Sequence, residues 1–228
     1  NALGNSLKFA LLSVPAGMAV ALAVAILVNQ KIRGITIFRT IYYIPAVASG
    51  IAIAMLWIFM YLPEQGLINT MARMLGLPDI DYLKRTEWAM PALAFMSIWV
   101  GLGPRMVLFL AGLIGIPQPL YESASIDGAS SWVCFKKITL PMLIPTTLFV
   151  LVTSTISTLQ MFTPVYLMTQ GGPEGSTDVV GYHIYTEAWV SFNTGLASAK
   201  SFILLLVIAA IAWLQFKLLQ EREMGGTA

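Results

Sequence analysis

The sequence predicts an all-α protein that crosses a membrane several times, and its composition supports this prediction in two ways. Hydrophobic residues make up 57% of the 228 residues and charged residues only 11%, whereas roughly a quarter of the residues in soluble domains are charged. The mean hydropathy is +0.78. Helices satisfy their own backbone hydrogen bonds in lipid, so apolar runs of about 20 residues are expected to cross as helices. The net charge of +2 gives no indication of nucleic-acid binding.

Several apolar runs are long enough to span a bilayer, and we interpret the whole chain, 1–228, as one transmembrane domain. The five expected spans are 9–28, 40–62, 88–115, 140–163 and 195–216. A further apolar stretch, 179–192, is too short and polar to cross, so we expect it near the surface. The sequence begins at Asn1 rather than Met. We interpret this as the loss of one N-terminal span, which would give the full protein six.

Basic residues orient the spans, because short cytoplasmic loops of membrane proteins are enriched in Lys and Arg. They gather in the connections after the first, third and fifth spans: Lys31, Arg33, Arg39, Lys136, Lys137, Lys217 and Arg222. We therefore expect these segments to be cytoplasmic, and the segments 63–87 and 164–200 to be external. We interpret four aromatic residues near the span ends as an interfacial belt: Trp57, Tyr61, Trp88 and Trp213.

The connection 117–141 separates the third and fourth expected spans. Pro117 and Pro119 are expected to end the preceding helix. Glu122 then falls in the first turn of a new helix, where the helix dipole favours a carboxylate. Gly128 permits a turn, so two short helices with a sharp bend are expected. Such a shape can insert into a groove on another protein, and the alternative is an ordinary amphipathic connector.

The spacing of residues in this connection resembles the EAA loop of the membrane subunits of bacterial ABC importers. Glu122-Ser123-Ala124 is followed by Gly128 and then by Ile138-x-Leu140-Pro141, and only Ser123, in place of alanine, departs from the family pattern. The resemblance implies that the loop docks on a cytoplasmic ATPase subunit and receives its motion. By that resemblance we assign eight residues to coupling: Glu122, Ser123, Ala124, Asp127, Gly128, Ile138, Leu140 and Pro141.

Other segments resemble the carbohydrate-uptake branch of this family, in particular the first permease subunit of maltose, lactose and glycerol-3-phosphate systems. They are Phe38-Arg39-Thr40 with Tyr43-Ile44-Pro45, Gly66-Leu67-Ile68-Asn69, Ile126-Asp127-Gly128-Ala129, and Gly171-Gly172-Pro173 with Ser176-Thr177. The resemblance implies a multi-pass subunit of the bacterial cytoplasmic (inner) membrane that carries a sugar or oligosaccharide. The partners it implies are a second permease subunit, two ATPase subunits, and a periplasmic or lipid-anchored solute-binding protein.

The chain contains no G-x4-G-K-[ST] phosphate loop, so we expect the partner ATPase to bind ATP and Mg, and this chain to bind no cofactor. No metal site is expected, because Cys134 is the only cysteine and His183 and Glu187 have no second histidine beside them. An amino-acid or peptide permease is the runner-up function, followed by a passive channel. We reject an intramembrane enzyme, because no catalytic constellation lies within the spans.

The fourth expected span is the most polar one and could supply hydrogen bonds to a sugar. Ser154, Thr158 and Met161 share one helical face at positions i, i+4 and i+7. We assign Ser154 and Thr158 as hydroxyl partners of the solute. The alternative is that these hydroxyl groups bond to carbonyl groups of their own helix or join helices together.

Arg105 places a charge inside the third expected span. A guanidinium there costs about 2.5–3.5 kcal/mol on insertion scales, and such a charge indicates a functional site by default. Gly101, one turn earlier, could loosen the helix and expose carbonyl groups toward a cavity. One interpretation is that Arg105 meets an anionic solute, such as a uronate oligosaccharide or a sugar phosphate. The alternative is that its side chain extends to the cytoplasmic headgroups.

Overall fold

The regular structure is helical throughout residues 1–30 and 35–225, which are the residues that the computed structural model describes. The α-helices are α1 (Ala2–Val28), α2 (Ile35–Val47), α3 (Gly50–Met60), α4 (Leu67–Met74), α5 (Thr86–Ile114), α6 (Gln118–Ile126), α7 (Ser131–Cys134), α8 (Leu140–Met142), α9 (Ile144–Leu159), α10 (Val180–Tyr185) and α11 (Thr194–Gly225). Single π-helical turns cover Phe135–Thr139, Val165–Thr169 and Thr186–Val190. Lys31 and Arg33, two of the residues used to orient the spans, lie outside the described residues.

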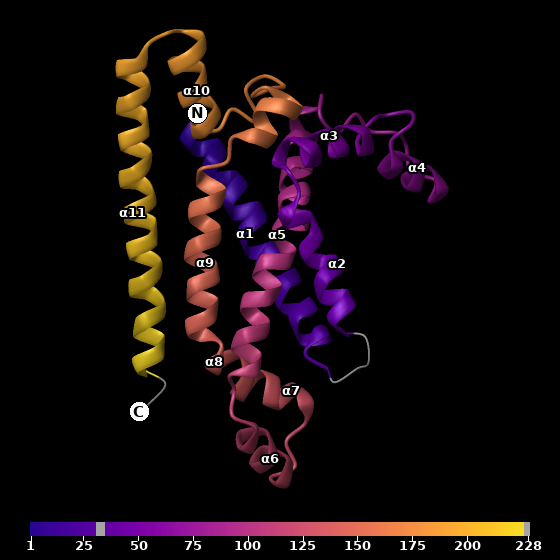
Figure 1. Cartoon of the computed structure of the whole chain (residues 1–228), viewed down its shortest axis with the longest axis vertical. Helices are drawn as coiled ribbons and strands as arrows, with labels where there is room; N and C mark the ends of the chain where they lie inside the picture. The colour runs from indigo at the N-terminus through magenta and orange to yellow at the C-terminus, as the bar shows by residue number, and fades with distance from the viewer. Residues whose placement is uncertain (31–34, 226–228) are drawn as a thin grey trace.

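The long helices form a bundle whose two ends differ (Figure 1). α1 packs against α5 and α9, α2 against α5, and α11 against α9. α3, α4 and α10 gather at the end where the N-terminus lies, and α6 and α7 project from the end where the C-terminus lies. The segments predicted to be external, 63–87 and 164–200, therefore share one end of the bundle, opposite the predicted cytoplasmic connection 117–141.

Three helices are long and apolar enough to cross a membrane: Ala2–Val28, Thr86–Ile114 and Thr194–Leu218. They coincide with the first, third and fifth expected spans. Two further candidates are bent pairs of helices, so the described residues contain up to five spans if each pair crosses once. The prediction of an all-α polytopic membrane protein is confirmed.

The expectation of one continuous helix over 40–62 is wrong. The chain bends by 98° between Ile37–Val47 and Gly50–Met60. Pro45 cannot donate a backbone hydrogen bond, and the helix ends two residues later. Ser49 then adopts an extended conformation with φ −58° and ψ 130°. α3 consequently runs across the end of the bundle instead of continuing the direction of α2 (Figure 1).

The expected span 140–163 is also interrupted. Ser131–Met142 and Ile144–Leu159 meet at 63°, and Leu143 between them has ψ −1°. Pro145 stands in the first turn of α9, where a missing N–H group leaves no hydrogen bond unmade. α9 ends at Leu159, so Met161 lies just beyond the helix on which it was expected.

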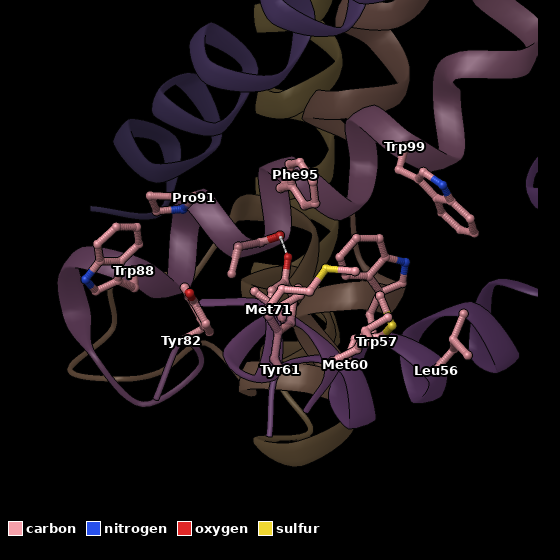
Figure 2. Close-up of a pocket in the computed structure, with 13 residues that line it drawn as sticks. Leu56, Trp57, Met60, Tyr61, Met71, Tyr82, Trp88, Pro91, Phe95 and Trp99 are labelled. Carbon is pink, nitrogen blue, oxygen red and sulfur yellow. Dashed lines mark hydrogen bonds between the residues drawn. The ribbon is translucent and has the colours of Figure 1, made fainter. Parts of the chain in front are cut away.

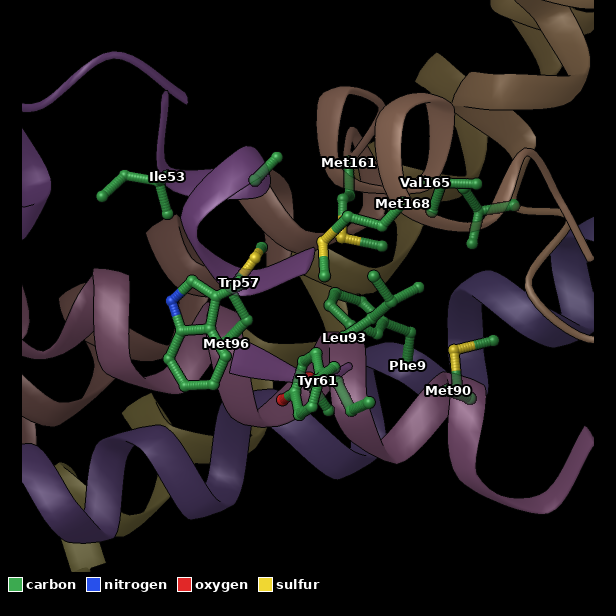
Figure 3. Packing of buried hydrophobic residues seen from close by; sticks show 14 residues of the cluster. Phe9, Ile53, Trp57, Tyr61, Met90, Leu93, Met96, Met161, Val165 and Met168 are labelled. Carbon is green, nitrogen blue, oxygen red and sulfur yellow. Dashed lines mark hydrogen bonds between the residues drawn. The ribbon is translucent and has the colours of Figure 1, made fainter. Parts of the chain in front are cut away.

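A large buried cluster joins α1, α3 and α5 to the segment that follows α9. Figure 3 shows Phe9, Trp57 and Met161 within this cluster. Trp57 and Tyr61 are each only 3% exposed, so their interpretation as interfacial residues is wrong. The Tyr61 hydroxyl donates to the carbonyl oxygen of Ala92 at 2.8 Å, which anchors the end of α3 to α5.

The outer end of α5 carries a cavity of about 710 Å³ with mostly apolar and aromatic walls. Figure 2 shows Trp57, Tyr82, Trp88 and Phe95 around it. Tyr82 meets Trp88 edge to face, with ring centroids 5.7 Å apart, and its ring lies 5.4 Å from that of Tyr61. These ring contacts hold the segment after α3 over the first turns of α5.

The backbones of α2 and α5 lie in close contact at Gly103. A Cβ atom on this residue would overlap the carbonyl oxygen of Tyr42 and lie 2.7 Å from the Cα atom of Tyr43. Two backbones can come this close only where one residue has no side chain. Gly103 therefore sets the distance between α2 and α5.

Asn69 organises the external segment around α4. Its side chain is fully buried. Its amide group donates to the carbonyl oxygens of Leu62 at 3.1 Å and Ile80 at 2.9 Å, and its carbonyl oxygen accepts from the backbone N–H of Ile80 at 3.0 Å. The Asn69 side chain thus links Leu62 and Ile80, the two ends of the segment.

Substitution Asn69→Ala should loosen this segment without unfolding the bundle. Three hydrogen bonds are lost, each with a net value of about 1 kcal/mol, so the local opening free energy should fall by about 3 kcal/mol. Amide hydrogen exchange over residues 62–80 measures this change. Asn193→Ala, which removes only an exposed contact to the N–H of Leu196, is the control and should cost about 1 kcal/mol or less. Unchanged exchange in Asn69→Ala would contradict the assignment.

Candidate functional site

The connection between α5 and α9 forms a compact unit at the end of the bundle, which we call the α6–α7 unit (residues 117–141) (Figure 1). α5 ends at Ile114, and Pro117 and Pro119 stand at the start of α6 rather than merely closing α5. α6 therefore begins at Gln118, one turn earlier than expected. The expected place of Glu122 in the first turn is wrong, because the first turn of α6 contains no acidic residue.

The turn after α6 explains the spacing of Ala124 and Gly128. The N–H of Ala129 donates to the carbonyl oxygen of Ala124 at 2.9 Å, and the N–H of Gly128 donates to that of Ser125 at 3.1 Å. This pair of hydrogen bonds is a Schellman motif, which needs a left-handed residue directly after the helix cap. Gly128 has φ +74°, and Asp127 is the cap before it. The predicted turn at Gly128 is thus present.

The acid of the motif faces outward. Glu122, Ser123 and Asp127 are exposed, and the Glu122 carboxylate forms no hydrogen bond or ion pair with any residue in the described part of the chain. The carboxylate is therefore free to meet a partner. The backbone of Ser123 keeps the helical role of the alanine it replaces, because its carbonyl oxygen accepts from the N–H of Asp127 at 3.1 Å.

The second half of the unit connects it to the bundle. Ser130 caps α7 by accepting from the N–H of Val133. The hydroxyl groups of Tyr121 and Thr139 lie 2.9 Å apart and link α6 to the π-helical turn. Ile138 packs against the buried cluster of α1 and α5. Leu140 and Pro141 begin α8 and are exposed. From α7 the chain continues through the π-helical turn at Phe135–Thr139 into α8.

The tip of the unit exposes apolar side chains. Ile126 is 87% exposed and Trp132 69% exposed, and Leu120 and Val133 are also on the surface. Neither Ile126 nor Trp132 is among the eight residues assigned to coupling from the sequence. Exposed apolar residues rimmed by polar ones mark interaction surfaces in proteins. In a unit outside the apolar part of the bundle, they indicate a protein partner.

A second set of candidate residues meets at mid-bundle. The Nε–H of Arg105 on α5 donates to the hydroxyl oxygen of Ser154 on α9 at 3.0 Å. The guanidinium lies against Gly101 and against Gly17 of α1. Gly101 is near the midpoint of the 29-residue α5 and lies one turn before Arg105. The Arg105 side chain therefore points toward the middle of the bundle, away from the α6–α7 unit. The alternative in which Arg105 extends to the cytoplasmic headgroups is therefore wrong.

Two other hydroxyl-bearing residues of α9 form hydrogen bonds within their own helix. Thr153 and Ser157 donate to the carbonyl oxygens of Phe149 at 2.7 Å and Thr153 at 2.9 Å, within their own helix. Thr158 and Met161 line a small cavity of about 290 Å³ together with Gly101 and Arg105. The structure thus brings together all five of the residues assigned to the solute pathway, since Ser154 binds Arg105 beside that cavity. Gly17 was missed, because nothing in the sequence separates it from other small residues of α1.

His183 and Glu187 are partly buried and take part in a group of polar contacts. Lys200 of α11 donates to Glu187 Oε1 at 2.6 Å and lies 3.0 Å from His183 Nε2. Asp178 approaches His183 Nδ1 at 3.2 Å. These contacts join α10 to α11. No group of three metal-ligating side chains suited to a metal ion occurs in residues 1–30 and 35–225.

Comparison with known proteins identifies the protein family of this chain. Residues 13–222 match the family described as "Binding-protein-dependent transport system inner membrane component". The chain belongs to this family of permeases. The family resemblance predicted from the sequence is confirmed, and the permease is a component of the inner membrane. The α6–α7 unit and the mid-bundle residues are thus features of a transport subunit.

Several relatives match almost the whole permease. The sn-glycerol-3-phosphate transport system permease protein UgpA of Agrobacterium fabrum is 34% identical over 228 residues, which is 97% of this chain and 77% of the relative. The lactose transport system permease protein LacF of Rhizobium radiobacter is 35% identical over 230 residues, which is 97% of this chain and 76% of the relative. The probable ABC transporter permease protein YesP of Bacillus subtilis is 34% identical over 213 residues, 92% and 68%.

Solved structures agree with the bundle described above. A bacterial ABC transporter involved in the import of the acidic polysaccharide alginate superimposes with a TM-score of 0.86 and 27% identity, over 96% of this chain and 78% of that one. The same alginate transporter in complex with its alginate pentasaccharide-bound periplasmic protein also gives 0.86, with 26% identity, over 97% and 78%. The permease therefore shares its fold with the membrane part of an importer that works with a periplasmic protein.

Proposed function

We propose that this permease forms half of the translocation pathway of an ATP-driven importer for a sugar or oligosaccharide. A second permease subunit supplies the other half, two cytoplasmic ATPase subunits bind ATP and Mg, and a periplasmic or lipid-anchored protein delivers the solute to the external end. The permease itself does no covalent chemistry. The similarity to permeases of lactose and glycerol-3-phosphate systems supports the solute class.

The single observation that carries the coupling part of this proposal is the α6–α7 unit. A helix closed by a Schellman motif presents an unpaired carboxylate and an exposed apolar tip, outside the bundle and at the end where the C-terminus lies. The hydrogen bond between Tyr121 and Thr139 connects that tip to the helix leading into α9. A push on the tip is therefore transmitted to α9, which carries Ser154 and Thr158.

Substitution Ile126→Asp tests this assignment. Placing a charge in an apolar docking surface should weaken ATPase binding by 2 kcal/mol or more, which is about thirtyfold. We expect ATP-driven sugar uptake into proteoliposomes to fall by a similar factor, with the permease still in the membrane. The control is Leu77→Asp, which changes another exposed aliphatic residue (55%, against 87% for Ile126) at the opposite end of the bundle.

Three results would count against the proposal. Full ATP-dependent uptake and ATPase co-purification in Ile126→Asp would remove the docking role of the α6–α7 unit. Solute movement that continues without ATP would indicate a passive channel. Equal loss in both variants would show a general effect of surface charge and would also count against specific docking.

A further inference from the structure

The Arg105 guanidinium is held in a fixed position by three helices. A Cβ atom on Gly101 would lie 2.8 Å from its Cζ atom, and a Cβ atom on Gly17 would overlap Nη1. Ser154 on α9 accepts from Nε. Two glycines therefore leave the space that the guanidinium fills, and one hydroxyl group orients it. Such positioning of a charged side chain is typical of a site formed before its ligand arrives.

The hydrogen-bonding capacity of this guanidinium is not used up. The Nη1 atom is buried and has no hydrogen-bond partner among the described residues. A guanidinium has five N–H donors in a planar fork suited to carboxylate and phosphate groups. Buried polar atoms without a partner are uncommon in native structures, and each one requires an explanation.

The charge of Arg105 is also uncompensated within this chain. No carboxylate in residues 1–30 or 35–225 forms an ion pair with it. α1 and α9 contain no acidic residue at all, and the only acid of α5, Glu87, stands in its first turn. A cation at mid-bundle with no anion nearby attracts an anion from outside the chain.

The cavity beside Arg105 has the chemistry of a sugar site. Its volume is about 290 Å³, and its lining includes the hydroxyl-bearing residues Ser97, Ser157 and Thr158 and the aromatic residues Phe9 and Phe162. Sugars present hydroxyl groups at their edges and apolar C–H groups on their faces, so this combination suits them. Because Arg105 lines the same cavity, a sugar that carries a negative charge suits it better than a neutral one.

We propose that Arg105 binds the carboxylate or phosphate group of an anionic sugar as that sugar passes through the bundle. This proposal rests on the transport function proposed above and narrows its solute to sugar acids or sugar phosphates. The guanidinium, which lines the cavity, donates to the anionic group, Ser154 keeps it in place, and Thr158 lies in the same cavity as the sugar. An acidic side chain of the second permease subunit is the competing source of the anion.

The local charge can be measured without knowing the natural solute. In the importer assembled with its partners, Cys134→Ser removes the single cysteine of these 228 residues, and Thr158→Cys places a new one in the cavity. An anionic and a cationic methanethiosulfonate reagent are then compared by their rates of reaction. A nearby unpaired guanidinium should raise the anionic-to-cationic rate ratio at least about tenfold. Arg105→Gln should abolish this preference, and Arg105→Lys should largely keep it.

Protection identifies the class of anion. D-galacturonate and D-glucose 6-phosphate should slow modification of the introduced cysteine, whereas D-galactose and D-glucose at equal concentration should not. Protection by only one of the two anions distinguishes a carboxylate solute from a phosphate solute. In Arg105→Gln, neither anion should protect.

Three results would overturn the proposal. The rate ratio could be the same with Arg105 and with Gln, as expected if an acid of the second permease subunit neutralises the guanidinium. Neutral and anionic sugars could protect equally. Neither reagent could reach the thiol. Since the modification needs neither ATP nor docking of the ATPase, any of these results leaves the Ile126→Asp test unaffected, and the two proposals fail separately.

Discussion

Substitution Gly103→Ala should destabilise the permease strongly, although alanine favours helices more than glycine does. In an exposed helix this change stabilises by about 1 kcal/mol. At position 103 the new methyl group would overlap the backbone of Tyr42, so α2 and α5 must move apart. Overpacking of this kind costs typically 1–3 kcal/mol, and contact with backbone rather than a flexible side chain places it at the upper end of about 3 kcal/mol. A lower melting temperature in detergent measures the loss.

The control for this prediction is Gly4→Ala in α1. A Cβ atom there has no other atom within 4 Å, so only the helix preference remains and stability should be unchanged or slightly higher. The two variants make the same chemical change in two long helices, and we expect effects of opposite sign. If Gly103→Ala were as stable as Gly4→Ala, the close approach of α2 to α5 would be disproved.

Substitution Gly128→Val should weaken coupling strongly while leaving the bundle intact. A Cβ atom on Gly128 meets nothing within 4 Å, so no clash is involved, and the cost comes from its φ of +74°. A left-handed conformation costs about 1–2 kcal/mol in an ordinary residue, and a β-branched one tolerates it least. The turn should therefore open and move the exposed tip. We expect ATP-driven uptake to fall about tenfold or more, the factor that corresponds to 1.4 kcal/mol.

Two further variants test whether the loss of uptake comes from backbone strain at Gly128 itself or from backbone strain anywhere in the permease. Gly128→Asn should retain most of the uptake, because asparagine adopts the left-handed conformation readily. Gly76→Val strains a glycine with the same φ of +74° in the external segment, and its coupling should be normal. If uptake in Gly128→Val equalled that of the wild type, the turn would have no part in transmitting motion.

Hydropathy located the long helices but not their bends. Pro15, Pro91 and Pro104 lie inside continuous helices, whereas Pro45 precedes a turn of 98°. All four have the same local effect on hydrogen bonding. The difference depends on what each helix packs against, which a single sequence does not contain. The buried position of Trp57 follows from the same bend, since it directs α3 onto α5 and away from lipid.

The candidate sites were predictable where a local rule governs them. Ala124 and Gly128 have the spacing of a helix-ending motif, and the turn forms as that spacing requires. Glu122 was placed one turn too early, because Pro117 and Pro119 were interpreted as ending a helix when they begin one. The direction of the Arg105 side chain could not be predicted, because it depends on space left by Gly17, a residue on another helix.

The π-helical turn at Phe135–Thr139 determines how the exposed tip of the α6–α7 unit is rotated about the helix axis relative to the bundle. Such a turn contains one more residue than the α-helix around it, and one residue corresponds to a rotation of about 100° about the helix axis. A permease in which a single residue is deleted from this turn would keep every side chain of the tip, yet present Trp132 in a direction about 100° away. The orientation of the tip relative to the bundle therefore depends on the number of residues in this turn as well as on their identity.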